Sequence, residues 1–383
     1  MSDLQRQTRD RPFTTGVDTH YCRFSERRHF GSLDGLRCIS ILAVIWSHGP
    51  GQRATSVLLT SGRLGVDLFF AISGFLITTL LLRERRSTAS ISLRRFYARR
   101  ALRIFPLYYT VLAIYIAAEL VHRGRASGHQ TFFGNLPYFL TYTSNWFVSA
   151  TAVFGHAWSL ATEEQFYCGW PWIEKYFPKV APLWVSALIV MALLVGHNVV
   201  AVDGFPRIVV LSVAVPICFG VLVAHLLHER WGFSEAFRWF GFRGAPVAAF
   251  AATAVLISLR ADRALVDLSF AIVVATCVIR EDHFLRRLLS IPLVVRVGAV
   301  SYGMYLIHGL VYNVVDRAGS AVGMSRYGIP MFIIALALTL LLANFSYQRY
   351  ESIFLRMKRR FEVPSGSVGQ QIPEKALAAD FRG

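Results

Sequence analysis

The stretch "RCISILAVIWSHGPG", residues 37–51, joins an apolar run to an arginine at one end and a histidine at the other. In a continuous helix, Arg37 and His48 would lie about 16 Å apart along the axis, at roughly 1.5 Å of rise per residue. The run belongs to a longer apolar segment, 36–59, that a Gly-Pro-Gly sequence interrupts. It predicts a membrane-crossing helix that buries a titratable imidazole.

The composition agrees with a membrane protein. Of the 383 residues 54% are hydrophobic and only 16% are charged, which is too apolar for an ordinary soluble domain. The formal net charge is +17, a balance typical of proteins that contact nucleic acids or anionic lipids. The distribution of these charges favours lipid and membrane topology, so no nucleic-acid partner is expected.

Apolar segments long enough for a helix to cross a hydrocarbon core of about 30 Å recur along the chain. We expect an all-α polytopic membrane protein, a bundle of about ten transmembrane helices. The predicted spans are 36–59, 64–82, 101–121, 157–175, 181–202, 207–228, 245–260, 264–280, 294–315 and 328–348. Segment 131–150 is apolar but contains Gly, Pro and Asn, so we read it as re-entrant or interfacial; as a full crossing it would be the eleventh.

The basic residues orient this topology. Ten spans place both termini on one side, and the positive-inside rule makes that side the cytoplasm. Only nine of the 40 Lys and Arg residues then fall outside: Arg53, Arg63, Arg123, Arg125, Arg207, Arg260, Arg263, Arg317 and Arg326. We therefore expect a cytoplasmic tail at 1–30 with no cleavable signal peptide, a membrane domain at 31–350, and a cytoplasmic tail at 351–383 that is partly disordered.

The five cysteines do not predict a metal site or a disulfide framework. Four lie inside predicted spans and none forms a C-x-x-C pair, so they are read as small buried hydrophobic residues. The sequence contains no Walker loop, dinucleotide fingerprint or zinc-ligand spacing. No metal and no tightly bound cofactor is expected.

Three ionisable residues on different spans have the same predicted depth. His48 follows Arg37 by eleven residues, Glu163 precedes Lys175 by twelve, and His308 follows Arg296 by twelve. Each therefore lies roughly 16 to 18 Å from the cytoplasmic surface. A charged side chain costs about 2.5 to 3.5 kcal/mol in the membrane centre, so such groups should face the bundle interior.

This common depth predicts a carboxylate beside an imidazole. Glu163 would raise the basicity of His48 and fix its tautomer, which makes the pair a candidate general base. The alternative is that each of the three residues is a polar core group hydrogen-bonded to a neighbouring helix.

Several sequence blocks together resemble the acyltransferase 3 family of membrane enzymes. They are "LDGLRCISILAVIWSHG", "GRLGVDLFFAISGFLIT", "FYARRALRIFPLYY", "HAWSLATEEQFY" and "SYGMYLIHG", in the order typical of the family, over about residues 30–350. The resemblance implies a ten-span bundle in the bacterial inner membrane. It would transfer an acyl group, with acetyl expected, from cytoplasmic acyl-CoA to a hydroxyl of a sugar or glycan acceptor.

The resemblance also assigns positions. The family's Arg, ten residues, His signature falls on Arg37 and His48, with His48 the expected catalytic residue. The arginine block falls on Arg99, Arg100 and Arg103. The remaining block falls on Trp158, Ser159, Glu163, Gln165, Phe166 and Tyr167. The C-terminal esterase-like domain of some members is not expected in a chain of this length.

General chemistry is consistent with these assignments. Acyl transfer to an alcohol needs a base for the hydroxyl proton, which His48 could supply with Glu163 orienting it. Guanidinium groups of Arg99, Arg100 and Arg103 could hold the phosphates of CoA, or could be positive-inside anchors only. Arg37 would guard the cytoplasmic entrance or bind a phosphate, or act as a snorkelling anchor.

Other residues are candidates for substrate contacts. Asp67 would bind a sugar hydroxyl or cap a helix, and Asp267 is read as a cap. Trp158 could stack on a sugar ring or belong to an aromatic belt at the membrane interface. Ser73 leaves a covalent acyl-enzyme route open beside direct transfer. Tyr167 and His308 complete the predicted substrate-binding set.

Two other functions remain open from the sequence. Midplane ionisable residues and a Gly-Pro-Gly break are also typical of a proton-coupled carrier of a glycan or small metabolite, although no inverted repeat is found. A scaffold for a glycan-assembly complex would not require His48 or Glu163. The acceptor, the acyl chain, the membrane face of the final transfer and the oligomeric state are not predicted.

Overall fold

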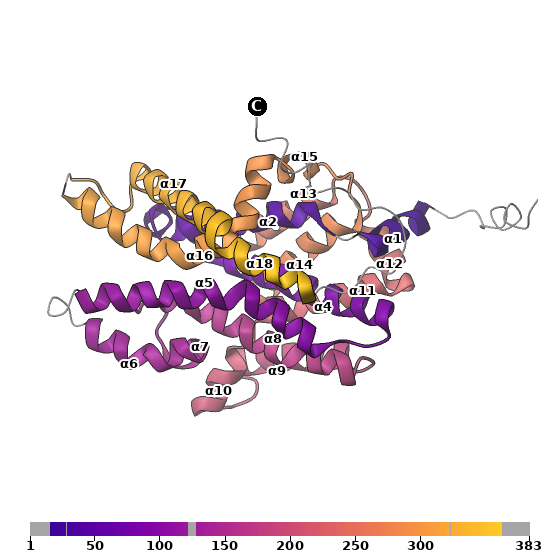
Figure 1. Cartoon of the computed structure of the whole chain (residues 1–383). Helices are drawn as coiled ribbons and strands as arrows, with labels where there is room; N and C mark the ends of the chain where they lie inside the picture. The colour runs from indigo at the N-terminus through magenta and orange to yellow at the C-terminus, as the bar shows by residue number, and fades with distance from the viewer. Residues whose placement is uncertain (1–15, 28, 122–127, 322, 362–383) are drawn as a thin grey trace, which may run out of the picture.

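Helices make up the fold. The computed structural model describes residues 16–27, 29–121, 128–321 and 323–361, and these residues contain no strand (Figure 1). Ten longer helices overlap the ten predicted segments. They are α2 (Gly31–Ser47), α4 (Gly65–Thr88), α5 (Leu93–Val121), α8 (Trp158–Tyr176), α9 (Ala181–Gly196), α11 (Val215–His228), α13 (Ala245–Ser258), α14 (Arg263–Ile279), α16 (Pro292–Ser320) and α17 (Ile329–Ser346).

Shorter elements connect them. They are α1 (Gly16–Glu26), η2 (Pro50–Arg53), α3 (Val57–Thr60), η3 (Gly62–Leu64), α6 (Gly128–Leu140), α7 (Ser144–Phe147), η4 (Gly155–Ala157), α10 (Gly204–Leu211), α12 (Arg230–Phe240), α15 (Arg286–Leu289), the π-helical turn η5 (Tyr347–Glu351), α18 (Ser352–Lys358) and η6 (Arg359–Phe361).

Fewer helices than ten have the length and composition of a membrane span. Four of those described qualify alone: Gly62–Thr88, Leu93–Val121, Pro292–Ser320 and Ile329–Phe361. Three bent helix pairs raise this number to at most seven. The all-helical membrane class is therefore supported, whereas ten crossings are not confirmed. α8 shows why, because its 19 residues include Glu163, Glu164, Glu174 and Lys175.

Two predicted segments differ from the observed helices. The first span was expected to reach residue 59, but α2 ends at Ser47 and short turns follow, because Gly49 and Pro50 interrupt a continuing helix. Segment 131–150 forms α6 and α7, and neither is among the candidate spans. Whether this segment re-enters the membrane stays a prediction.

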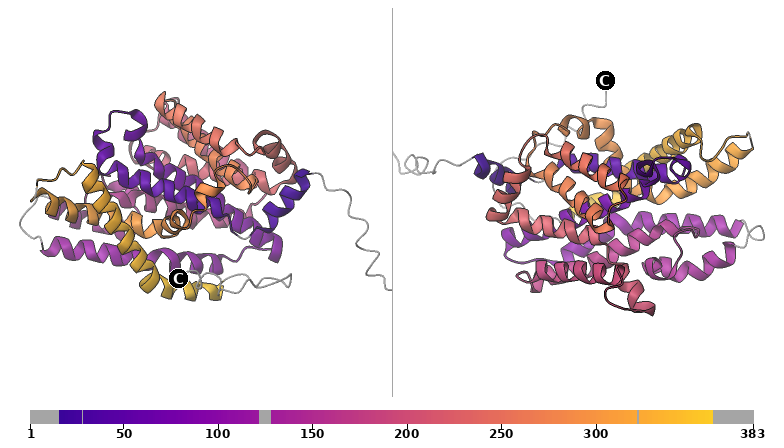
Figure 2. Two further views of the ribbon diagram at one scale, coloured as in Figure 1. Left: turned by 90° about the horizontal axis from the view of Figure 1, so that it is seen from above. Right: turned by 180° about the vertical axis from the view of Figure 1, so that it is seen from behind.

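Three pairs of close helices hold the bundle together: α4 packs on α11, and α16 packs on both α2 and α17 (Figures 1 and 2). The α4–α11 crossing depends on Gly74 and Gly220. A β-carbon on Gly74 would overlap the Ile217 carbonyl oxygen, and one on Gly220 would overlap that of Ala71. Side chains at these two positions would push the helices apart.

The segments predicted as tails take part in the fold where the structure describes them. Phe24 of α1 is fully buried against the rings of Phe30, Phe233 and His228. α18 and η6 pack along α5. Both segments carry apolar side chains that can be buried against the bundle. Their charges alone did not predict this packing. Residues 1–15, 28 and 362–383, the rest of the predicted tails, lie outside the described residues.

The bundle has two ends. The end formed by α1, α12 and the last turns of α4, here called the basic end, contains Arg83, Arg85 and Arg86 (Figure 1). There Arg83 donates to the Phe24 carbonyl and Arg86 to that of His228. The opposite end contains the turn between α16 and α17, where Arg53 of η2 lies over the Tyr327 ring at 4.2 Å. α2, α5 and α16 extend between the two ends.

Candidate active site

His48 is the residue at which α2 stops. As the helix cap it lies next to Gly49 and Pro50, which cannot continue the helix in this geometry. Its Nδ1 lies 2.9 Å from the Val44 carbonyl oxygen, one turn earlier in the same helix. Because a carbonyl oxygen only accepts, Nδ1 carries the proton and Nε2 has the free lone pair. The backbone of α2 therefore sets the tautomer that a general base requires.

Three imidazole rings form a row, which we call the histidine row. The rings of His48 and His308 meet edge to face with centroids 4.7 Å apart, and those of His308 and His156 are 4.8 Å apart. The prediction that His48 and His308 share a layer is supported by this contact. His156 was not predicted, although it is the first residue of the "HAWSL" block.

Each of the other two imidazoles is also tied to a backbone carbonyl. His308 is completely buried, and its Nδ1 contacts the Tyr305 carbonyl oxygen at 2.5 Å. Nε2 of His156 lies 3.3 Å from the Leu306 carbonyl oxygen. Gly309 leaves room for this ring, since a β-carbon there would lie 3.2 Å from Cε1 of His156.

Two tyrosines of α16 brace the row. The Tyr305 hydroxyl donates to the His156 carbonyl at 2.9 Å and also pairs with Ser159 Oγ at 2.6 Å. The Tyr312 hydroxyl donates to the Ile45 carbonyl at 3.1 Å, near the end of α2. α16 therefore joins the turn before α8 to the end of α2, and so fixes where the three imidazoles meet.

Glu163 does not pair with His48. Its Oε1 accepts a hydrogen bond from Ser73 Oγ of α4 at 2.6 Å, while the ring contact of His48 is with His308. The predicted imidazole–carboxylate pair is wrong as a contact, because equal depth along two helices does not fix the direction in which their side chains point. The Val44 carbonyl occupies the position expected for Glu163.

The next acidic residue, Glu164, belongs to a half-buried arginine site. The Arg100 guanidinium lies over the Tyr167 ring at 3.7 Å, and its Nε is 3.9 Å from Glu164 Oε1. This arrangement combines a cation–π contact with an ion pair. Arg100 and Tyr167, predicted to bind donor and acceptor, thus lie against each other.

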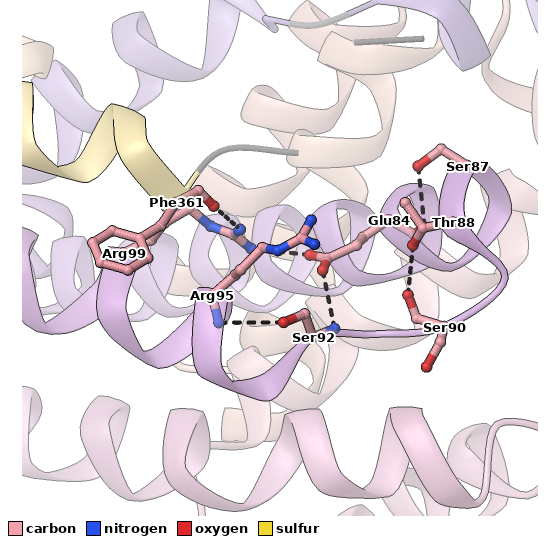
Figure 3. Close-up of polar contacts among 8 residues, drawn as sticks. All are labelled: Glu84, Ser87, Thr88, Ser90, Ser92, Arg95, Arg99 and Phe361. Atoms are coloured by element: carbon pink, nitrogen blue, oxygen red, sulfur yellow. Dashed lines mark hydrogen bonds and ion pairs between the residues drawn. The ribbon is translucent and has the colours of Figure 1, made fainter. Parts of the chain in front are cut away.

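Arg99 is held by two other groups. Its guanidinium is 3.0 Å from Glu84 Oε2 and donates to the Phe361 carbonyl at 2.7 Å (Figure 3). Glu84 is buried and also accepts from the backbone N–H of Ser92 at 3.0 Å. Figure 3 shows that these contacts fasten the α4–α5 loop and the end of η6 together. The Arg99 guanidinium is therefore already paired with groups of the protein itself.

Arg103 is the exception among the three arginines of the block. It is half-buried and forms no hydrogen bond or ion pair with the residues that the structure describes. The charges of Arg37 and Arg100 are close enough to act on it, and so is the carboxylate of Glu351. Arg37 itself lies 3.2 Å from Asp34, whose other oxygen is 3.1 Å from His29. Because Arg103 lacks a direct carboxylate contact, it is the guanidinium of the block most available to an anion.

The remaining candidates lie nearer the opposite end. Arg263 bridges Asp67 of α4 and Asp267 of α14. The cap of α14 is Asp262, which accepts from the Ala264 N–H at 2.8 Å, so the reading of Asp267 as a cap is wrong. Trp158 meets Phe70 edge to face at 6.0 Å. The described residues contain no group of three His, Cys, Asp or Glu placed to hold a metal.

Comparison with known proteins decides the family. Residues 30–346 match the acyltransferase domain family, from the residue before α2 to the end of α17. The chain belongs to the acyltransferase domain family. The match includes the whole histidine row and the arginine block, whereas Phe361, the partner of Arg99, lies beyond it. Membership places the chain among acyltransferases that move groups other than aminoacyl groups.

Two similar proteins are named as O-acetyltransferases. The peptidoglycan O-acetyltransferase OatA of Listeria monocytogenes is 26% identical over 367 residues, covering 85% of this chain and 56% of the relative. The O-acetyltransferase OatA of Staphylococcus aureus is 27% identical over 365 residues, covering 85% and 57%. The chain thus spans little more than half the length of these relatives. No solved structure matches it.

Proposed function

We propose that this chain is an integral membrane O-acyltransferase that moves an acetyl group from acetyl-CoA to a hydroxyl of a glycan. The names of the relatives support the acetyl group, and the word peptidoglycan in one of them supports a glycan acceptor. The observation that carries the proposal is the hydrogen bond between Nδ1 of His48 and the Val44 carbonyl. It leaves Nε2 as an open base at one end of the histidine row.

The transfer follows from that geometry. Nε2 of His48 takes the proton of the acceptor hydroxyl while its oxygen attacks the thioester carbonyl. The tetrahedral intermediate then collapses, the carbon–sulfur bond breaks, and His48 returns the proton to the CoA sulfur. No net proton is consumed or released. The Val44 carbonyl stabilises the imidazolium that exists between the two proton transfers, because its hydrogen bond to Nδ1 becomes stronger when the ring is charged.

The donor would enter from the basic end, which we assign to the cytoplasm. Arg103 is the residue we expect to bind a CoA phosphate, with Arg37 beside it, because Arg99 and Arg100 already have carboxylate partners. Arg37 precedes His48 by eleven helical positions, roughly 16 Å at 1.5 Å per residue. The flexible pantetheine arm of CoA would bridge this distance and bring the thioester to Nε2.

A reconstitution experiment tests the function. Purified protein in detergent or vesicles is given acetyl-CoA labelled in the acetyl group together with chito-oligosaccharides, and sugar-bound label is measured by mass spectrometry. His48→Ala should reduce transfer by roughly 10²- to 10⁴-fold, the range of general acid–base catalysis.

Two further results define the outcome. His197→Ala is the matched control, since His197 is exposed and pairs with Asp262 outside the site. Transport of the sugar into vesicles without acetylation would favour a carrier and contradict the proposal, as would full transfer by the His48→Ala protein.

A further inference from the structure

His308 has a buried nitrogen that nothing in the protein satisfies. Its Nδ1 donates to the Tyr305 carbonyl, so Nε2 has a lone pair and no hydrogen. This Nε2 is fully enclosed and makes no hydrogen bond in the part of the chain that the structure describes. An unsatisfied buried acceptor costs about 1 to 3 kcal/mol, which a donor supplied by a ligand would recover.

The neighbouring protein donors are already used. The hydroxyl of Tyr305 donates to the His156 carbonyl and that of Tyr312 to the Ile45 carbonyl. Nε2 of His156 is directed at the Leu306 carbonyl and Nδ1 of His48 at the Val44 carbonyl. The charges around the row do not supply a donor either, since the hydrogen bond described for Arg326 goes to Asp316.

The position of this acceptor relates it to the reaction. The His308 ring packs edge to face against His48 with centroids 4.7 Å apart. Because the two rings are in contact, the group beside the reacting hydroxyl is the part of a substrate that we expect to reach His308. The adjacent group must carry a hydrogen, because Nε2 can only accept.

We propose that His308 is a specificity-determining residue that accepts a hydrogen bond from the group next to the reacting hydroxyl of the acceptor. That group is a second hydroxyl or an amide N–H, so the preferred acceptor class is a vicinal diol or an amido sugar, not an isolated alcohol. This inference rests on the proposed function. It assigns to His308 a role in binding the acceptor, separate from proton transfer at His48.

Paired changes in enzyme and acceptor test it. The probes are methyl glucoside, methyl N-acetylglucosaminide and the monodeoxy forms of each. For the unaltered protein, removal of the group beside the acetylated hydroxyl should lower kcat/KM by roughly tenfold, as expected for one hydrogen bond of about 1.4 kcal/mol. His308→Phe should lower kcat/KM for the parent sugar by a similar factor and should use parent and deoxy sugars equally.

Two controls separate this role from a structural one. His308→Gln retains an acceptor oxygen and should restore part of the preference for the parent sugar. The KM for acetyl-CoA should be the same in all three proteins, which also verifies that the Phe variant is folded.

The possible results distinguish the role of His308 from the proposed function. If His308→Phe discriminates against the deoxy sugar as strongly as the unaltered protein, the inference is overturned while the proposed function stands. If His308→Phe instead shifts the pH profile and leaves the acceptor KM unchanged, His308 acts on the proton and the inference is also overturned. If the unaltered protein acetylates none of the sugars, the glycan acceptor fails and this inference fails with it.

Discussion

In the histidine row, each imidazole has one nitrogen tied to a backbone carbonyl, whereas toward the basic end Arg99 and Arg100 are tied to carboxylates of other helices. Backbone carbonyls fix orientation but leave the second ring nitrogen open. Carboxylates neutralise a guanidinium and use up its capacity to bind an anion. Membership in a sequence block therefore does not tell which side chain is free to meet a substrate.

The largest expected effects come from substitutions of Arg103 and Arg99. Arg103→Ala should raise the KM for acetyl-CoA by about 10- to 100-fold, the equivalent of 1.5 to 3 kcal/mol for a charged hydrogen bond, with little change in Tm. Arg99→Ala should instead lower Tm and leave that KM within a few-fold of normal, because its contacts join the α4–α5 loop to Phe361. Steady-state kinetics and thermal unfolding in one detergent measure both. If Arg99→Ala raised the KM for acetyl-CoA and Arg103→Ala lowered only the Tm, Arg99 and not Arg103 would be the residue that binds the donor.

Glu163 tests whether a carbonyl or a carboxylate orients the catalytic imidazole. Glu163→Gln keeps an oxygen that can accept from Ser73 Oγ, so activity should fall by less than about tenfold, the value of one neutral hydrogen bond. Ser73→Ala serves as the partner control and should have an effect of similar size. A loss as large as that of His48→Ala would show that Glu163 acts on the imidazole after all.

Gly309 tests the packing of the histidine row. In Gly309→Ala the new methyl group would lie 3.2 Å from Cε1 of His156 and 3.0 Å from the Tyr115 hydroxyl. We expect a several-fold decrease in kcat with an unchanged KM for acetyl-CoA. Gly303→Ala on the same helix is the matched control, since its nearest contacts of 3.4 to 3.5 Å are ordinary ones. Equal activities of the two variants would mean that the position of His156 is unimportant.

The smallest expected effect on activity belongs to the loop after α14, at the basic end, where the test is one of stability. Burial, with help from Arg286, lowers the pKa of His283 to about 4. An unfolded histidine has a pKa near 6.5, so the contribution of neutral His283 to stability is complete above that pH and is lost as the pH falls from about 6.5 to about 4. Thermal unfolding should show this loss, and His283→Gln should reduce the dependence of Tm on pH in that range. If the Tm of His283→Gln depended on pH as that of the unaltered protein does, His283 would not be the source of this pH dependence.

Much of the helix pattern was predictable, because long apolar runs can form only a few structures in a membrane. The end of α2 at His48 follows from the Gly-Pro-Gly sequence after it. The hydrogen bond to Val44 could also have been anticipated, since the two residues are four positions apart in one helix. The number of crossings was not predictable in the same way, because helices such as α8 combine apolar length with buried charges.

The arrangement of the site depends on contacts between distant segments. Glu84 reaches Arg99 only through the fold of the α4–α5 loop, so the sequence could not separate Arg99 from Arg103. His156 lies in the short turn η4 and contributes through α16, 150 positions later. The depth of Glu163 was estimated from helical rise, but the direction of its side chain depends on how α8 is rotated against α4.

The contact between Arg99 and the Phe361 carbonyl has a practical consequence for protein engineering. It ties Phe361, the last residue that the structure describes, to the first turns of α5, on the side from which we expect CoA to arrive. A reporter or affinity module fused directly after this residue would crowd the donor's path, so the length of the linker, and not only the module, would govern the activity of a tagged enzyme.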